Sequence, residues 1–423
     1  MIGIVYPLLA FVSNSIWTST TSITTPLLDY YNITSTVVGR FPNLVFSVLF
    51  LILGPTSAWV TRRIGILWTL FLSSAVMTAG CFFSSLAANG FFWLMLGSSL
   101  VAVTQPYIFS NTSTVALMVV GAGNQGMYIG SASVVGSVGT AWGFAVSIWL
   151  ISDATDYGHY FPSIELLYLA MSGTCTAALL VVVLRRRAAG RLAGSTSGSG
   201  SVIGGAGTEG EHVTQSGAAA SDVPAAESLH SMHRQMMPPV ENKYKIATSV
   251  LIAAILGGMS NAVTVVLEQV MEQEDGRSDY DVFVAGALYL IPSIPTAFAF
   301  GYWMDITSHE TAVVAGVYIS TALLQVVVLT SGISLPLLYT ALTVYGATTN
   351  VLSTVCLPSS NRWANGNHAK LINTTLSYLN NLFSFVLTVL FSVVSVQVST
   401  ALNWALTAFS LAGAIALCFM RTA

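Results

Sequence analysis

The chain has 423 residues, of which 54% are hydrophobic and only 7% charged, and its formal net charge is −3. A water-soluble globular domain of this length needs far more charge to cover its surface, so the composition excludes that class and indicates a protein of the lipid bilayer. We expect the bilayer and a small-molecule solute as partners and no nucleic acid, with a monomer as the default oligomeric state.

A bilayer span needs about 20 apolar residues to cross roughly 30 Å of hydrocarbon. Twelve segments meet or approach this length, near residues 2–24, 34–60, 66–87, 91–118, 122–151, 162–184, 246–270, 282–304, 311–331, 335–357, 371–394 and 398–420. Six precede and six follow a polar stretch that opens with Arg185, Arg186 and Arg187. The pattern predicts an all-α membrane protein with 12 transmembrane helices in two six-helix bundles, 1–184 and 246–423, joined by a linker at 185–245.

Basic residues are retained on the cytoplasmic side in short loops, so their distribution predicts the orientation. With the N-terminus inside, all of the 14 Lys and Arg residues except Arg40 and Arg277 fall on the cytoplasmic side. We therefore expect both termini and the linker to be cytoplasmic. Residues 188–240 are rich in Gly, Ser and Ala and poor in aromatic residues, a composition typical of a flexible linker.

The sequence contains no Gly-rich phosphate loop, nucleophile elbow or metalloprotease helix, and its four cysteines lie inside apolar segments. We therefore expect no enzymatic activity, no catalytic residues, no cofactor and no metal site. Asn32 begins an Asn-Ile-Thr sequon in the first outer loop, and whether it is glycosylated is left open. A facilitator, a coupled secondary transporter or a receptor with a transporter fold remain.

Two six-span halves joined by a basic cytoplasmic linker resemble the major facilitator fold, whose solute site lies between the halves near the bilayer midplane. Gly301-Tyr-Trp-Met-Asp305 in the second half resembles the Gly-x-x-x-Asp loop motif of that fold. In the first half, Gly54 and the pair Arg62 and Arg63 match the motif but its acid is missing. The resemblance implies gating roles for Asp305, Arg62 and Arg63, with Asp305 accepting hydrogen bonds from a helix N-terminus or pairing with a basic residue in one conformation.

Short stretches resemble the feline leukaemia virus subgroup C receptor-related transporters more narrowly. They are Ser13-Asn14 through Ser22-Ile23, Gly139-Thr-Ala-Trp-Gly-Phe144, Leu267-Glu-Gln269 and Gly301-x-Trp303-x-Asp305-x-Thr307. The resemblance implies an organic solute of the haem or choline and ethanolamine kind. It also implies an aromatic cage for a quaternary ammonium group, but Trp17 falls one residue before the family's span 1 tryptophan and Asn261 replaces the span 7 tyrosine.

Arg40 lies about one and a half turns into the second predicted span, where an ionisable side chain normally faces the bundle interior or water. The resembling family carries an acid there, and Arg362 is a second such reversal. These changes favour an anionic solute, with Arg40 as its counter-ion. The alternative is that Arg40 snorkels to the outer interface and that Arg362 is an ordinary basic residue of a cytoplasmic loop.

Polar side chains inside other predicted spans are candidate solute ligands. Gln105 precedes Pro106, so its amide either binds solute or satisfies the carbonyl that the proline leaves without a partner. Asn380 and Asn381 form the most polar patch of the second half, and Asn381 matches a family glutamine. Such amides either contact solute or join helices. Asn261 follows Gly257-Gly258, which either packs closely against a helix or unwinds its own.

Three further features concern coupling and helix geometry. Glu165 and Glu268 lie near outer span ends, where a hydrated interfacial carboxylate is the expected state and proton coupling the alternative. A row of small residues in the fifth span, including Gly130 and Gly139, favours close helix approach. Pro292 and Pro295 predict a kink in the eighth span.

The sequence therefore predicts a transporter that moves a small organic solute by alternating access, with Trp17, Arg40, Gln105, Asn261 and Asn381 lining the site. A haem-like or choline-like solute is the leading expectation. An organic anion transporter and a non-transporting receptor or sensor are the alternatives.

Overall fold

The computed structural model is all-helical throughout the residues that it describes, which are 1–420 without 21–22, 34–40, 122–123, 152, 197–241, 273–278, 308, 330–334, 350, 365–368 and 394–395. The first half contains α1 (Ile2–Ser19), α2 (Thr24–Tyr30), α4 (Phe41–Ile64), α5 (Ile66–Ser84), η2 (Ala87–Asn89), α6 (Phe91–Phe109), α7 (Thr112–Val120), α8 (Gln125–Leu150) and α9 (Ala154–Thr196). The second half contains α11 (Lys243–Glu272), α12 (Asp279–Leu290), α13 (Ser293–Ile306), α14 (Glu310–Leu329), α15 (Leu335–Thr349), α16 (Leu352–Trp363), α17 (Ala369–Val393) and α18 (Val396–Phe419).

Met1–Val183 and Glu241–Ala423 form one compact unit, and Leu184–Val240 form a second. The first unit holds both halves, and their division into separate bundles stays a prediction. α9 continues to Thr196, so the first residues of the predicted linker are helical. Most of that linker lies outside the described residues.

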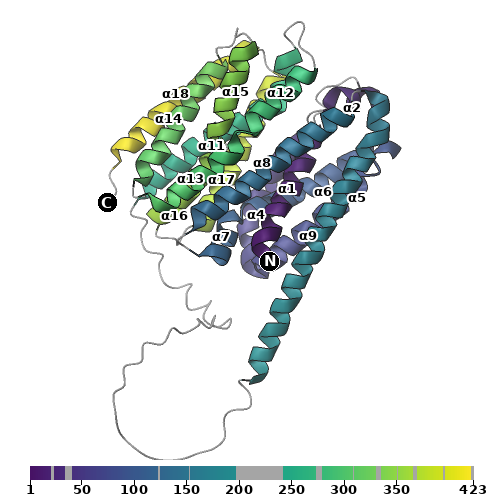
Figure 1. The fold of residues 1–423 in the computed structure, drawn as a ribbon, viewed down its shortest axis with the longest axis vertical. Helices are drawn as coiled ribbons and strands as arrows, with labels where there is room; N and C mark the ends of the chain where they lie inside the picture. The colour runs from purple at the N-terminus through teal and green to yellow at the C-terminus, as the bar shows by residue number, and fades with distance from the viewer. Residues whose placement is uncertain are drawn as a thin grey trace, which may run out of the picture. The chain divides into compact units, whose positions relative to one another are not determined.

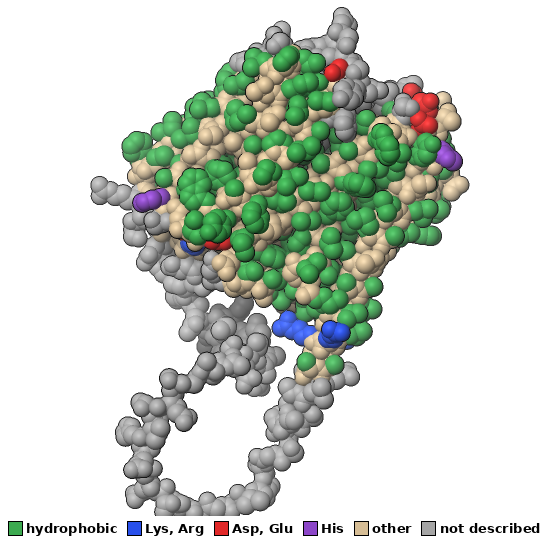
Figure 2. Space-filling model, in the orientation of Figure 1, with side chains coloured by type: hydrophobic (Ala, Val, Ile, Leu, Met, Phe, Trp, Pro, Cys, Tyr) green, Lys and Arg blue, Asp and Glu red, His purple; other side chains and the backbone are tan. Residues whose placement is uncertain are grey.

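Ten helical segments among the described residues are long and apolar enough to cross a membrane. The tenth and eleventh predicted spans are not among them. The tenth corresponds to two shorter helices, α15 and α16, and the eleventh corresponds to α17, whose inward side carries amides. Large apolar side chains are exposed on the helix surfaces, as for Trp149 at 82% and Ile4 at 70%, and hydrophobic side chains cover most of the face in Figure 2. Such a surface fits lipid and would be unfavourable in water.

The two halves repeat the same helix pairing. α1 packs along α8 in the first half, and α11 packs along α17 in the second. Between the halves, α8 lies beside α13 (Figure 1), and α17 lies beside α4. The interface between halves is therefore made by two equivalent helix pairs, as expected for a chain built from structural repeats.

Small residues of α8 explain how it packs on both sides, as the row of glycines predicts. Ser15 and Thr18 of α1 donate hydrogen bonds to the carbonyls of Gly139 and Thr140, at 2.9 and 3.0 Å. Near the other end of α8, a Cβ built on Gly130 would lie 2.7 Å from the Ala297 carbonyl of α13. One glycine row thus serves both the core of the first half and its contact with the second.

The predicted kink of the eighth span is confirmed. α12 ends at Leu290, and α13 begins at Ser293 after Pro292. Proline has no backbone N–H and its ring crowds the preceding turn, which favours a break in the helix at this point. Helix α6 also ends soon after its proline, Pro106, and Ser110 and Asn111 separate it from α7.

Glu165 contradicts the prediction of a hydrated interfacial carboxylate. Its side chain in α9 is 1% exposed, and its Oε2 has no hydrogen-bond partner among the described residues. The side chain of Glu268 lies outside them. Burial of a carboxyl without a partner is unfavourable, because lost hydration is not replaced. The sequence could not show this, because position near a span end does not reveal which face of a helix is covered.

Replacing Glu165 by methionine is therefore expected to stabilise the protein by about 1–3 kcal/mol, because a side chain of similar length fills the space without an unpaired polar atom. Thermal unfolding in detergent would measure it, with Asp29→Asn on the exposed face of α2 as the control. A fall in the midpoint for Glu165→Met would mean that the carboxyl has a stabilising partner.

Candidate functional site

A cavity of about 290 Å³ lies between the two halves. The first half contributes α1, α4, α6, α7 and α8, and the second contributes α11, α12, α15, α16 and α17. A solute held there would touch both halves at once, which is the position that alternating access requires.

The described lining residues are uncharged. The hydrogen-bonding side chains are amides and hydroxyls: Asn14, Ser47, Gln105, Thr112, Ser133, Ser137, Thr140, Ser260, Asn261, Thr349, Ser353, Asn373, Ser377, Asn380, Asn381 and Ser384. The aromatic side chains come mainly from the first half: Tyr6, Trp17, Phe46, Phe50 and Phe109, with Tyr289 from the second. The cavity thus has an aromatic wall on one side and an amide-rich wall on the other.

Four of the predicted solute ligands line this cavity: Trp17 from α1, Gln105 from α6, Asn261 from α11 and Asn381 from α17. The structure therefore brings together side chains that are far apart in the sequence. Arg40 lies outside the described residues. A solute-binding role for these five side chains stays a prediction.

Gln105 and Asn381 differ in whether the side-chain amide is already hydrogen-bonded within its own helix. Gln105 is 6% exposed and forms no hydrogen bond to another described residue. The Asn381 Nδ2 donates to the Ser377 carbonyl one turn earlier in α17, at 2.9 Å. The Gln105 amide is therefore the more available of the two for a solute.

The glycine pair before Asn261 packs closely and does not unwind the helix. α11 is continuous from Lys243 to Glu272. A Cβ built on Gly258 would lie 2.5 Å from the Phe383 Cβ and 2.9 Å from the Asn380 carbonyl of α17. Of the two alternatives left open by the sequence, close packing is the one found.

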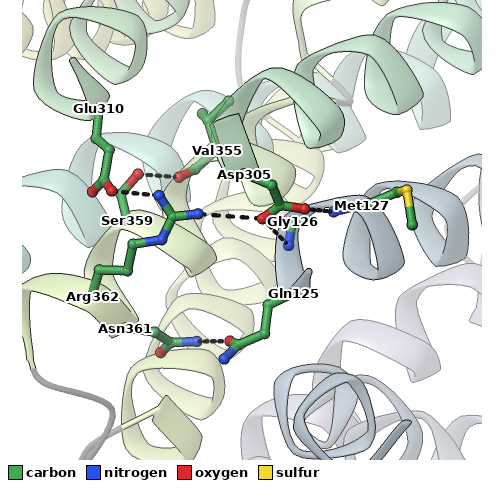
Figure 3. Close-up of polar contacts among 9 residues, drawn as sticks. All are labelled: Gln125, Gly126, Met127, Asp305, Glu310, Val355, Ser359, Asn361 and Arg362. Carbon is green, nitrogen blue, oxygen red and sulfur yellow. Dashed lines mark hydrogen bonds and ion pairs between the residues drawn. The ribbon is translucent and has the colours of Figure 1, made fainter. Parts of the chain in front are cut away.

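We call the end of the unit at which α1 and α8 begin the basal end. The two helices are joined there, because the Tyr128 hydroxyl of α8 donates to the Gly3 carbonyl of α1 at 3.4 Å. Polar contacts also join the two halves at this end. Asp305, at the end of α13, lies beside the first turn of α8 (Figure 3). Its carboxylate accepts hydrogen bonds from the backbone N–H groups of Gly126 at 3.0 Å and Met127 at 2.7 Å. The first N–H groups of a helix have no partner within the helix, and they favour a negative charge.

Arg362 of α16 holds Asp305 from the other side. Its guanidinium donates to the Asp305 carboxylate at 3.2 Å and to Glu310 of α14 at 2.5 Å (Figure 3). Asp305, Glu310 and Arg362 all belong to the second half, so this ion network can persist when α8 moves away. Arg362 therefore positions Asp305 and neutralises part of its charge.

The role of Arg362 was missed by the sequence analysis, which treated it as a loop residue or as a lost acid. α16 in fact extends through Arg362 to Trp363. The available signal was the pair of acids, Asp305 and Glu310, which lie at the end of the predicted eighth span and just before the predicted ninth and both need a basic partner.

Two neutral contacts complete the basal end. The Asn361 amide donates to the Gln125 side chain at 3.4 Å, next to the Asp305 network. On the opposite side, the Asn373 amide of α17 donates to the Phe109 carbonyl at the end of α6, at 3.1 Å. Among the described residues, the halves are thus joined at this end by one contact region that includes the Asp305 carboxylate and by one that is uncharged.

Arg62 and Arg63, predicted to share in gating, are exposed at the end of α4 and take no part in the Asp305 network. The Arg63 guanidinium lies over the Trp59 ring of its own helix, 5.4 Å from the ring centre. Counted from Gly54 as Asp305 is counted from Gly301, the position equivalent to Asp305 is Ala58.

A family model described as the Major Facilitator Superfamily matches residues 6–359. Among solved structures, the chain resembles the crystal structure of a single-substitution form of the E. coli fucose:proton symporter FucP, with a TM-score of 0.62 and 10% sequence identity. The match covers 97% of this chain and 98% of the symporter. No curated protein matches the sequence significantly.

Proposed function

The chain belongs to the major facilitator superfamily and is a membrane transporter of small solutes, and we propose that its cavity binds a small, uncharged, polar solute that crosses by alternating access. The observation that carries this proposal is the chemistry of the lining, in which amides and hydroxyls face aromatic rings and no described side chain is charged.

The uncharged lining favours a solute that carries no net charge. An ion that enters the cavity loses hydration, and without an opposite charge this costs several kcal/mol. A neutral solute with hydroxyl groups instead exchanges water for amides and hydroxyls, while its apolar face lies against the aromatic rings. A monosaccharide or a polyol of similar size meets these requirements.

A choline-like solute is the second candidate, favoured by the presence of Trp17 in the lining together with Phe46 and Phe50, since aromatic faces attract a quaternary ammonium group. Haem fits less well, because its carboxylates would need cationic partners. The organic anion alternative depends on Arg40, which lies outside the described residues. Membership in the feline leukaemia virus receptor-related group stays a prediction.

We further propose that the basal end faces the cytoplasm and that Asp305 forms the inner gate. The predicted orientation supports this assignment, because the α13–α14 segment that carries Asp305 is on the cytoplasmic side in it. The inner gate is closed when Asp305 binds the α8 N-terminus, and opens when the halves separate there.

Uptake into proteoliposomes tests the proposed function, with fucose, glucose, myo-inositol, choline, ethanolamine, haem and succinate as labelled solutes. We expect saturable uptake of at least one of the neutral polyols. Replacing Gln105 by leucine should weaken the apparent affinity about tenfold, because one hydrogen bond in the cavity is lost. Gly316→Ala in α14, where a Cβ meets nothing within 4 Å, is the matched control.

Other results would select the alternatives. Succinate uptake that is lost in Arg40→Gln would show that the protein transports organic anions and uses Arg40 as the counter-ion. Choline uptake that is lost in Trp17→Leu would show that the protein transports a choline-like solute and uses Trp17 to bind it. Binding of a solute without any uptake would indicate a receptor or sensor.

A further inference from the structure

Asn380 of α17 has an amide oxygen that forms no hydrogen bond to the described residues. It lies on the cavity wall, and its Oδ1 is buried without a hydrogen-bond partner among the described residues. The neighbouring Asn381 is different, because its Nδ2 donates to Ser377 within the same helix. The two adjacent amides are therefore not equivalent, although the sequence alone favoured Asn381.

Gly257 of α11 makes room for this amide. A Cβ built on Gly257 would lie 2.5 Å from the Asn380 Oδ1, closer than real Cβ atoms approach other atoms. The adjacent Gly258 brings the backbones of α11 and α17 together, as described above. The amide is thus placed by the helix crossing as well as by its own side-chain conformation.

An unpaired buried amide oxygen is unfavourable, because it loses its hydration without gaining a hydrogen-bond partner. Buried polar groups are almost always paired. The Asn380 Oδ1 has less than 1 Å² of accessible surface and lies against Gly257, so rotation of the amide toward the cavity is what would let a bound molecule supply the donor. On α17 itself, Ser377 and Ser384 also line the cavity, and their hydroxyls can orient the same solute.

We propose that Asn380 accepts a hydrogen bond from an O–H or N–H group of the transported solute and thereby selects for solutes that carry such a donor. This inference rests on the proposed function, because it takes the cavity as the solute site. A site that pairs with a donor rejects an analogue that lacks the donor, because the amide is then left without a hydrogen-bond partner. A quaternary ammonium group has no N–H, so a choline-like solute would satisfy Asn380 only through its hydroxyl group.

The test compares binding of matched solutes with and without donors. The probes are glucose and fucose with their deoxy and O-methyl analogues, and choline with its O-methyl ether. Binding to the purified full-length protein is measured by calorimetry. For the wild-type protein we expect at least one analogue to bind about tenfold more weakly than its parent. Asn380→Leu, of nearly the same shape, should weaken the parent to a similar extent and abolish the discrimination.

Gly257→Ala provides a second route to the same result, because it keeps the amide but displaces it. It should reduce discrimination as Asn380→Leu does, whereas Gly316→Ala should behave as wild type. The inference is overturned if parent and analogue differ equally in wild type and Asn380→Leu, or if Gly257→Ala retains full discrimination. Failure of every probe to bind the wild-type protein would instead count against the proposed neutral polar solute, so the two failures are distinguishable.

Discussion

Replacing Asp305 by asparagine is expected to lower uptake at least about tenfold without reducing the amount of folded protein. Asn has one acceptor oxygen and no charge, whereas the Asp305 carboxylate serves two N–H groups of α8 and the Arg362 guanidinium. Hydrogen bonds to charged groups contribute about 1.5–3 kcal/mol each, and 1.4 kcal/mol changes an equilibrium tenfold. The closed basal end should therefore lose most of its population.

The conformational effect can be measured separately from uptake. A cysteine introduced at Leu357, which lines the cavity on α16, reports entry of a thiol reagent from the basal end. Labelling should be faster in the Asp305→Asn background than in the wild-type background. Asp29→Asn is the control for loss of a carboxylate elsewhere. Unchanged uptake together with unchanged labelling would remove Asp305 from the gate.

Replacing Gly301 by valine is expected to have an effect of similar size through shape alone. A Cβ on Gly301 would lie 2.7 Å from the Gly126 carbonyl of α8, and a Cβ on Gly126 would lie 2.7 Å from the Gly301 carbonyl. Both obstacles are backbone atoms, which cannot turn aside as a side chain can. The α8–α13 crossing must then open, so we expect uptake to fall by about tenfold or more.

The same labelling assay checks this prediction, with Gly316→Ala as the control for a glycine that has space around it. The variant Gly301→Val retains every charge of the Asp305 network, so it separates packing from electrostatics. Combined with Asp305→Asn it should cost little more than either change alone, because both act on one contact. Full additivity would mean that the two residues act on different steps.

Much of the fold follows from the sequence, because the lipid environment constrains it strongly. Apolar runs of span length, the proline in the eighth span and the glycines of the fifth each have a local physical meaning, and the structure agrees with them. The residues lining the cavity were partly predictable for the same reason, since a polar side chain such as Gln105 inside an apolar span must face something other than lipid.

The contacts that could not be predicted from the sequence depend on which helices pack together. The partner of Asp305 is Arg362, and they are brought together only by the packing of α13 against α16. The choice between Asn380 and Asn381 depends on which face α17 presents to Gly257. The burial of Glu165 likewise depends on its neighbours. Residue type predicted that these groups matter, but the tertiary arrangement determines which atoms meet.

The uncharged lining has an electrical consequence. A membrane potential acts on charge that moves within it, with about 2.3 kcal/mol per elementary charge per 100 mV. The described lining residues present no charge to that field as the halves rock around the cavity. The described lining would therefore contribute no charge movement when the carrier reorients, whether empty or loaded with a neutral solute, and a current that accompanies uptake would report an ion travelling with the solute or a charge outside the described lining.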